Sequence, residues 1–113
     1  MATRSFNVMS YSVSLTRELG WNINGTGVIH SASIRVQGQA AEEFLIIGFL
    51  PDDEAIPADA DGFIFRPQHE YLWYIDLLRN ERPITAIRHE NPAFNEIYTG
   101  PEPPGESEVP RTP

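Results

Sequence analysis

Apolar and polar residues alternate strictly near the N-terminus of this chain. Within residues 7–16, serine or threonine separates four apolar side chains, which are Met9, Tyr11, Val13 and Leu15. A period of two is typical of a β-strand with one buried face, and the same residues form no stripe at helical spacing. The pattern therefore predicts a strand, and leaves open whether that strand lies in the core or at the edge of a sheet.

Two further strands are expected after this one. Residues 17–20 are interpreted as a turn and residues 21–23 as a short strand. The pair Asn24-Gly25 strongly favours a two-residue hairpin turn, because both central positions of a type I′ turn need positive φ. Alternation then resumes over residues 28–36, with one face formed by Val28, His30, Ala32, Ile34 and Val36. The hairpin turn should therefore join two strands.

The next segments extend the β pattern. Residues 43–50 are apolar on both faces, which indicates a central strand covered on both sides. Residues 51–62 are expected to form a loop, followed by short strands at 63–65 and 94–98. The sequence thus predicts an all-β fold, a small antiparallel barrel or sandwich of about six to seven short strands.

The composition changes after residue 98, where proline, glycine and glutamate dominate. Such a segment buries too little apolar surface to fold by itself. We therefore expect one β domain over residues 1–98 and a flexible, acidic, proline-rich tail over residues 99–113.

The segment 70–91 admits two interpretations. A helix is favoured by Pro67 near its start, Arg79 in its last turn and Pro83 beyond its end. A hairpin is favoured because a helix here would be apolar almost all round and would have to be enclosed, which a domain of 113 residues can hardly do. Tyr, Trp and Ile also prefer strands. We favour the hairpin.

The hairpin implies a definite set of cross-strand pairs. A two- or four-residue loop would place Leu77 opposite Ile84, Ile75 opposite Ala86, and Trp73 opposite Arg88. The last pair could form a cation–π contact worth roughly 0.5–1 kcal/mol at an exposed site. A change of one residue in loop length would reassign every pair.

The net charge is −8, and all eight basic residues are arginine. An acidic surface repels the phosphates of duplex nucleic acid and of anionic membranes, so neither is expected as a partner. No apolar run approaches the roughly 20 residues that span a bilayer. The N-terminal residues also lack the apolar segment of a signal peptide. The chain has no cysteine, and we expect a cytoplasmic protein of a prokaryote or its virus.

The best metal-binding candidates are acidic residues of the loop 51–62. Asp59 and Asp61 precede Gly62 as at the start of a calcium loop, and Asp53 could add oxygen ligands. The rest of the EF-hand pattern is missing, so a solvated acidic loop is the favoured interpretation. His30 lies on the apolar face of its strand and is interpreted as a core histidine. We expect no metal and no cofactor.

Three classes of function fit the sequence. The first is a non-enzymatic protein-interaction domain that self-associates, or binds another protein, through an aromatic-rich sheet face or an edge strand. The second is a ligand-binding β-barrel for single-stranded nucleic acid or a small hydrophobic molecule. The third is a small calcium-binding module or enzyme, although no catalytic motif is visible. The candidate binding residues are Tyr71, Trp73, Tyr74, Arg88, Arg66 and Phe63.

Overall fold

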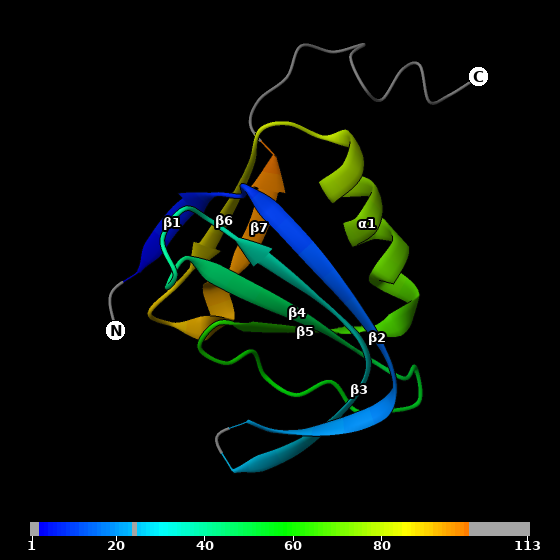
Figure 1. Ribbon diagram of the computed structural model, residues 1–113. Coiled ribbons are helices and arrows are strands. Elements are labelled where there is room, and N and C mark those ends of the chain that lie inside the picture. The colour runs from blue at the N-terminus through cyan, green and yellow to red at the C-terminus, as the bar shows by residue number, and fades with distance from the viewer. Residues whose placement is uncertain (1–2, 24, 100–113) are drawn as a thin grey trace, which may run out of the picture.

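The computed structural model describes residues 3–23 and 25–99, which form two β-sheets and one α-helix (Figure 1). The elements in chain order are β1 (Arg4–Asn7), β2 (Ser10–Ile23), β3 (Thr26–Gln37), β4 (Phe44–Leu50), β5 (Phe63–Pro67), the 3₁₀-helix η1 (Gln68–Glu70), α1 (Tyr71–Asn80), β6 (Ile84–Arg88), the 3₁₀-helix η2 (Pro92–Phe94) and β7 (Glu96–Thr99). The predicted all-β class is confirmed, as an open sandwich rather than a closed barrel. The predicted tail lies, from residue 100 onward, outside the described residues.

The three-stranded sheet has the order β1-β6-β7, and the four-stranded sheet has the order β2-β3-β4-β5. All pairs are antiparallel except β4–β5, which is parallel with Ile47 opposite Ile64. Parallel neighbours need a crossover of about a dozen residues or more, and the loop 51–62 is long enough to provide it. The expectation of a wholly antiparallel fold was wrong at this pair.

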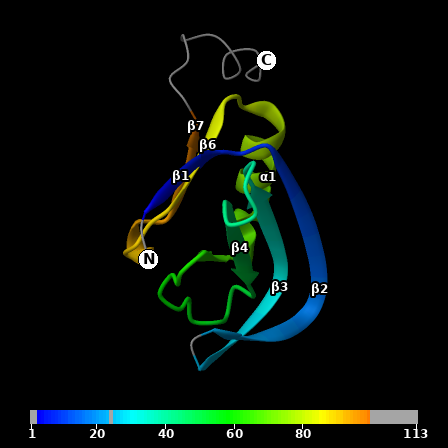
Figure 2. The same ribbon diagram turned by 60° about the vertical axis from the view of Figure 1, so that its left-hand side comes forward.

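The chain passes from one sheet to the other between β1 and β2. The Val8 N–H donates to the Ile84 carbonyl of β6 at 2.9 Å, and the next amide, Met9 N–H, donates to the Gln37 carbonyl of β3 at 2.8 Å. Successive backbone groups therefore join the two sheets at a corner. Figure 2 shows β1, β6 and β7 on one side and the curved β2–β3 hairpin on the other.

The β2–β3 hairpin is longer than the sequence pattern indicates. The predicted turn at residues 17–20 was wrong, because β2 continues through it with a shift of register between Leu15 and Leu19. Such a shift, typical of a β-bulge, bends a strand without ending it. Gly25 has φ of 81°, as the hairpin turn requires, whereas Asn24 is outside the described part of the chain.

The main core lies between the two sheets and α1. Its fully buried centre comes from alternating positions of β3 and β4, namely Ile34, Val36, Leu45, Ile47 and Phe49. The predicted face of residues 28–36 is confirmed, including buried His30, whose ring stacks on Trp21 with centroids 3.5 Å apart. A second cluster contains Val28, Leu50, Ala60 and Phe65, with Trp21 packed against it.

The predicted hairpin at 70–91 was wrong, because residues 71–80 form the helix α1. Its inner face places Tyr71 and Tyr74 edge-on against Phe49, with ring centroids 5.3 and 5.5 Å apart. The outer apolar residues of this helix are not enclosed, contrary to the expectation from sequence. Instead, Leu72 and Trp73 remain 71% and 65% exposed on the outer side.

The cross-strand pairs expected from the hairpin are absent for the same reason. Residues 84–88 do form a strand, β6, but it pairs with β1 and β7 rather than with residues 70–79. Ala86 lies opposite Phe6 and Ile97, and Ile84 lies opposite Thr99. The predicted contact of Trp73 with Arg88 is replaced by an edge contact of Trp73 with His69.

Candidate functional site

Four apolar side chains are left uncovered at the start of β2, three within the strand and Met9 immediately before it, and we call them the β2 strip. Their exposed fractions are 69% for Met9, 37% for Tyr11, 41% for Val13 and 73% for Leu15. Their regular spacing gathers them on one side of one strand. Single exposed apolar residues are ordinary on protein surfaces, whereas a contiguous row of them marks an interaction site more often.

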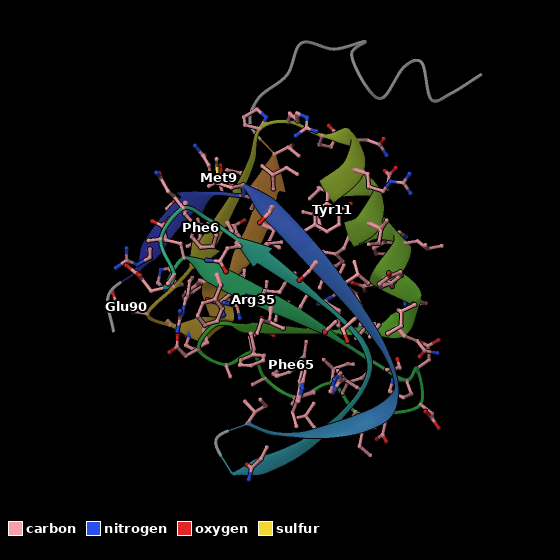
Figure 3. All side chains as sticks on the ribbon, in the orientation of Figure 1. Phe6, Met9, Tyr11, Arg35, Phe65 and Glu90 are labelled. Atoms are coloured by element: carbon pink, nitrogen blue, oxygen red, sulfur yellow. The ribbon has the colours of Figure 1, made fainter. Side chains whose placement is uncertain are left out.

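The β2 strip continues the face of the sheet that forms the main core. Tyr11, Val13 and Leu15 lie directly opposite the buried residues Val36, Ile34 and Ala32 of β3. Directly opposed residues of an antiparallel pair project from the same face. The helix and the second sheet thus cover β3 and β4 but stop short of β2. Figure 3 shows Met9 at the corner between β1 and β2, and Tyr11 between β2 and α1.

The backbone of β2 is as open as its apolar side chains. β2 is the outermost strand of its sheet and is paired only with β3, so every second residue turns its N–H and C=O groups away from any neighbouring strand. Proteins commonly protect such edges with charged residues or proline. Residues 5–16 contain neither.

The other described edge strands are protected in this way. Arg4 lies on β1, Arg66 and Pro67 lie on β5, and Glu96 lies on β7. The first half of β2 is therefore the uncharged edge among the strands of the described ranges. It combines free backbone hydrogen-bonding groups with an apolar row, which together are what an added strand needs.

A groove runs between the start of β2 and the end of α1. Its volume is about 750 Å³, and it is lined by Asn7, Val8, Met9, Ser10, Tyr11, Leu78, Glu81, Arg82, Pro83 and Ile84. The buried residues of its lining are Leu78, Ile84 and Glu81. Met9 and Tyr11 belong to both the groove and the β2 strip, so the two features form one surface.

The aromatic residues predicted to bind a partner have different surroundings. Tyr71 and Tyr74 are partly buried and pack against the main core, and burial raises the pKa of Tyr74. Phe63 contacts Trp21 and Phe65 in the second cluster. Trp73 is the exposed member of the set. The structure does not gather these residues on one surface, and their binding role stays a prediction.

The two arginines predicted to bind are each engaged within the protein. Arg66 donates to both carboxylate oxygens of Glu70 at 2.7 Å, and this hydrogen bonding lowers the pKa of Glu70 and raises that of Arg66. Arg88 donates to both carboxylate oxygens of Asp61 at 3.0 and 3.2 Å, and to the Glu42 carbonyl at 3.1 Å. Its guanidinium also lies 4.3 Å from the ring centre of Phe44. Arg88 thereby ties β6 to the loops flanking β4.

The acidic loop does not gather its carboxylates into a metal site. Asp59 accepts the Phe65 N–H at 3.0 Å, Asp61 is paired with Arg88, and Asp53 is exposed. Across residues 3–23 and 25–99, no three His, Asp or Glu side chains lie close enough to hold a metal ion. Burial raises the pKa of Asp59, opposed in part by the Phe65 hydrogen bond and the charge of Arg66.

The alternation of residues 9–15 is visible in the sequence, whereas the exposure of their apolar side chains is not. The same alternation is expected for a half-buried strand in the core and for an edge strand whose apolar face is exposed to solvent. Residues 5–16 contain neither charge nor proline, but the longer run 19–34 also lacks both, so this signal does not by itself distinguish an exposed edge from a buried strand. In the described part of the chain, no helix is long and apolar enough to cross a membrane.

The chain was compared with protein families, curated proteins and solved structures. No family model, no curated protein and no solved structure matches it.

Proposed function

We propose that this protein is a non-enzymatic interaction domain that associates with itself through the edge strand β2. The observation that carries the proposal is the uncharged, unpaired edge of β2 with the β2 strip beside it. Adding a strand at such an edge satisfies backbone hydrogen-bonding groups and removes apolar side chains from water in a single step.

The chemistry of the surface supports binding rather than catalysis. The side chains of residues 8–15 are apolar groups, serine hydroxyls and the phenol of Tyr11. A serine hydroxyl acts as a nucleophile only beside a positioned base, and an edge strand of alternating serine and apolar residues supplies none of its own. The same residues suit strand pairing, where each apolar or hydroxyl cross-strand pair contributes roughly 0.2–1 kcal/mol.

The charge of the chain narrows the kind of partner. A net charge of −8 makes most surfaces of one copy repel those of another. The neutral stretch 5–16 is a place where two copies can meet without that repulsion. It also offers no basic residue that would favour an acidic partner such as duplex nucleic acid.

Sedimentation velocity of the purified chain over a wide range of concentration tests self-association. We expect the weight-average mass to rise from monomer towards dimer between about 1 and 500 µM, since one pair of edge strands buries less than the roughly 1,600 Å² of a standard interface. A chain that stays monomeric over this range would remove self-association as its function.

A second candidate function is binding of a small hydrophobic molecule in the groove between β2 and α1. The specific observation is the groove itself, whose volume of about 750 Å³ falls within the roughly 300–1,000 Å³ of ordinary ligand sites. Fluorescence of an apolar dye such as anilinonaphthalene sulfonate tests it. Saturable binding that is lost when Tyr11 is replaced by Ala, but kept in Trp73→Ala, would favour this candidate.

For the location of the protein, we propose the cytoplasm of a prokaryote or its virus. What supports the cytoplasm is the absence of cysteine, because small proteins of oxidising compartments commonly depend on disulfides. Detection of the native protein in a fractionated host extract tests the location.

A further inference from the structure

We propose that the partner at β2 is a second copy of the same strand, paired antiparallel about a two-fold axis that passes through Ser12. This inference rests on the proposed function and adds to it the register and symmetry of the contact.

Symmetry limits the possible registers. A two-fold axis that makes two identical edge strands antiparallel neighbours in one sheet must be perpendicular to that sheet. Each residue then faces the same side of the sheet in both copies, and one residue lies opposite itself. For pairing centred on the β2 strip, that residue is Tyr11, Ser12 or Val13.

The fit of apolar residues separates these three registers. With Ser12 on the axis, Tyr11 lies opposite Val13 of the second copy, and Met9 lies opposite Leu15. All four members of the β2 strip then have an apolar partner on the same face. With Val13 on the axis, Met9 would lie opposite Arg17. With Tyr11 on the axis, Leu15 would lie opposite Asn7.

The polar face fits the same register. Ser12 lies opposite itself, and Ser10 lies opposite Ser14 of the second copy, so the outer face becomes a row of hydroxyls that can hydrogen-bond across the strands. Because residues 5–16 are uncharged, the pairing from Ser10 to Ser14, which lies within β2, brings no like charges into opposition. The regular register of β2 with β3 over residues 10–15 keeps this segment straight enough to pair.

The resulting dimer has a definite architecture. The two four-stranded sheets would join edge to edge into one continuous sheet. The two β2 strips would lie side by side on the face that carries α1, in the space between the two helices. The apolar face that ends abruptly at β2 in one copy would continue into the core face of the other.

Cysteine cross-linking tests the register, and the chain suits it because it contains no cysteine of its own. The variants are Ser10→Cys, Ser12→Cys and Ser14→Cys in the full-length protein, each an exposed and nearly isosteric change. Each variant alone, and each pair mixed in equal amounts, is oxidised mildly at about 500 µM and run on a non-reducing gel. Identical samples in 8 M urea correct for random collision.

With Ser12 on the axis, Ser12→Cys cross-links to itself, and Ser10→Cys cross-links to Ser14→Cys in their mixture. Ser14→Cys alone should yield at least about tenfold less covalent dimer, since four residues of offset along a strand, about 13 Å, far exceed the Cα spacing of a disulfide. A strong Ser12–Ser14 mixture would instead place Val13 on the axis, and a strong Ser10–Ser12 mixture would place Tyr11 there. Either result overturns the inference.

Failure of the inference is distinguishable from failure of the proposed function. A protein that sediments as a dimer but forms none of these cross-links associates through another surface, which refutes pairing at β2 while self-association stands. A protein that sediments as a monomer at every concentration refutes both.

Discussion

Tyr11 of β2 lies directly opposite Val36 of β3, on the same face of one sheet, yet Val36 is fully buried whereas Tyr11 is 37% exposed. Two adjacent strands with similarly apolar faces therefore differ in how far their side chains are buried. The core elements that bury β3 end before they reach β2. This change in burial between neighbouring strands of one sheet face is the structural basis for a contact surface at β2.

A charge placed in the β2 strip should abolish self-association. Val13→Arg places an arginine opposite Tyr11 of the second copy. Because the dimer is symmetric, each dimer contains the substitution twice. We expect the dimer dissociation constant to rise at least about 30-fold, which is roughly 2 kcal/mol, as measured by sedimentation velocity.

Ile56→Arg provides the matched control, because Ile56 has the same exposed fraction of 41% but lies in the loop 51–62. The control should dimerise as the wild type does, and both variants should keep the wild-type circular dichroism spectrum. Equal loss of dimer in both variants would mean that added charge, rather than the β2 strip, controls association.

Gly48 of β4 leaves room for the ring of Trp21. A Cβ atom added at Gly48 would lie 2.6 Å from Trp21 Cζ3 and 3.3 Å from Phe65 Cδ1, and the Trp21 ring is held in its stack on His30. Gly48→Ala should therefore lower the free energy of unfolding by about 1–3 kcal/mol through overpacking, as measured by urea denaturation. Gly27→Ala, where a Cβ meets no atom within 4 Å, should be near neutral. Equal stability of the two variants would contradict this account of the second cluster.

Asn95 joins three segments through its buried side chain. Its Nδ2 donates to the carbonyls of Ala60 and Phe63 at 3.0 and 3.2 Å, and its Oδ1 accepts the His89 N–H at 2.8 Å. Asn95→Ala leaves these backbone groups without that partner, at an expected cost of about 2–3 kcal/mol in the free energy of unfolding. The exposed Asn22→Ala should change it by less than about 0.5 kcal/mol. A small cost at Asn95 would show that water replaces its hydrogen bonds.

The ion pair of Arg66 with Glu70 should make stability depend on pH. Arg66 lowers the pKa of Glu70 below its ordinary value of 4.5, so the charged form is favoured by folding. Its contribution is present above pH 4.5 and is lost as the pH falls through the lowered pKa. Glu70→Gln should therefore cost about 1 kcal/mol at pH 7, limited by the solvent exposure of Arg66, and nothing once Glu70 is protonated. Urea denaturation at pH 7 and pH 2.5 measures the difference.

Asp59 serves as a control, because the pH dependence of its contribution to stability should have the opposite sign. Burial raises its pKa above 3.8, so folding favours its neutral form, and that contribution is lost as the pH rises through the raised pKa. Asp59→Asn keeps an acceptor for the Phe65 N–H and should hold or raise stability at pH 7. If both variants behave alike across pH, the environments assigned to the two carboxyls are wrong.

Apolar patterns predicted β3 and β4 well, because β3 buries one face and β4 is buried almost throughout. The alternation at Val28 to Val36 and the apolar run 43–50 gave β3 and β4 nearly at their true limits. The same alternation could not reveal that Met9 to Leu15 lies at an uncovered edge, since cover depends on where α1 and the second sheet end.

The helix α1 was missed for a related reason. Its residues look too apolar for a surface helix, but the outer ones, Leu72 and Trp73, are simply left in water. The local signals at Arg79 and Pro83 were correct indicators of the helix end. Long-range pairs such as Arg88 with Asp61, 27 residues apart, follow from the packing of the two sheets and carry no local sequence signal.

Residue-resolved hydrogen exchange at low and high protein concentration tests pairing at β2 most directly. The outward-pointing amides of residues 10–15 should exchange rapidly in the monomer and become protected at least tenfold, by roughly 1.4 kcal/mol, as the dimer forms. The outer edge of β7, which carries Glu96, should show no change and serves as the internal control. Protection that does not increase at β2, or that increases at β7 instead, would contradict the claim that this protein associates through β2.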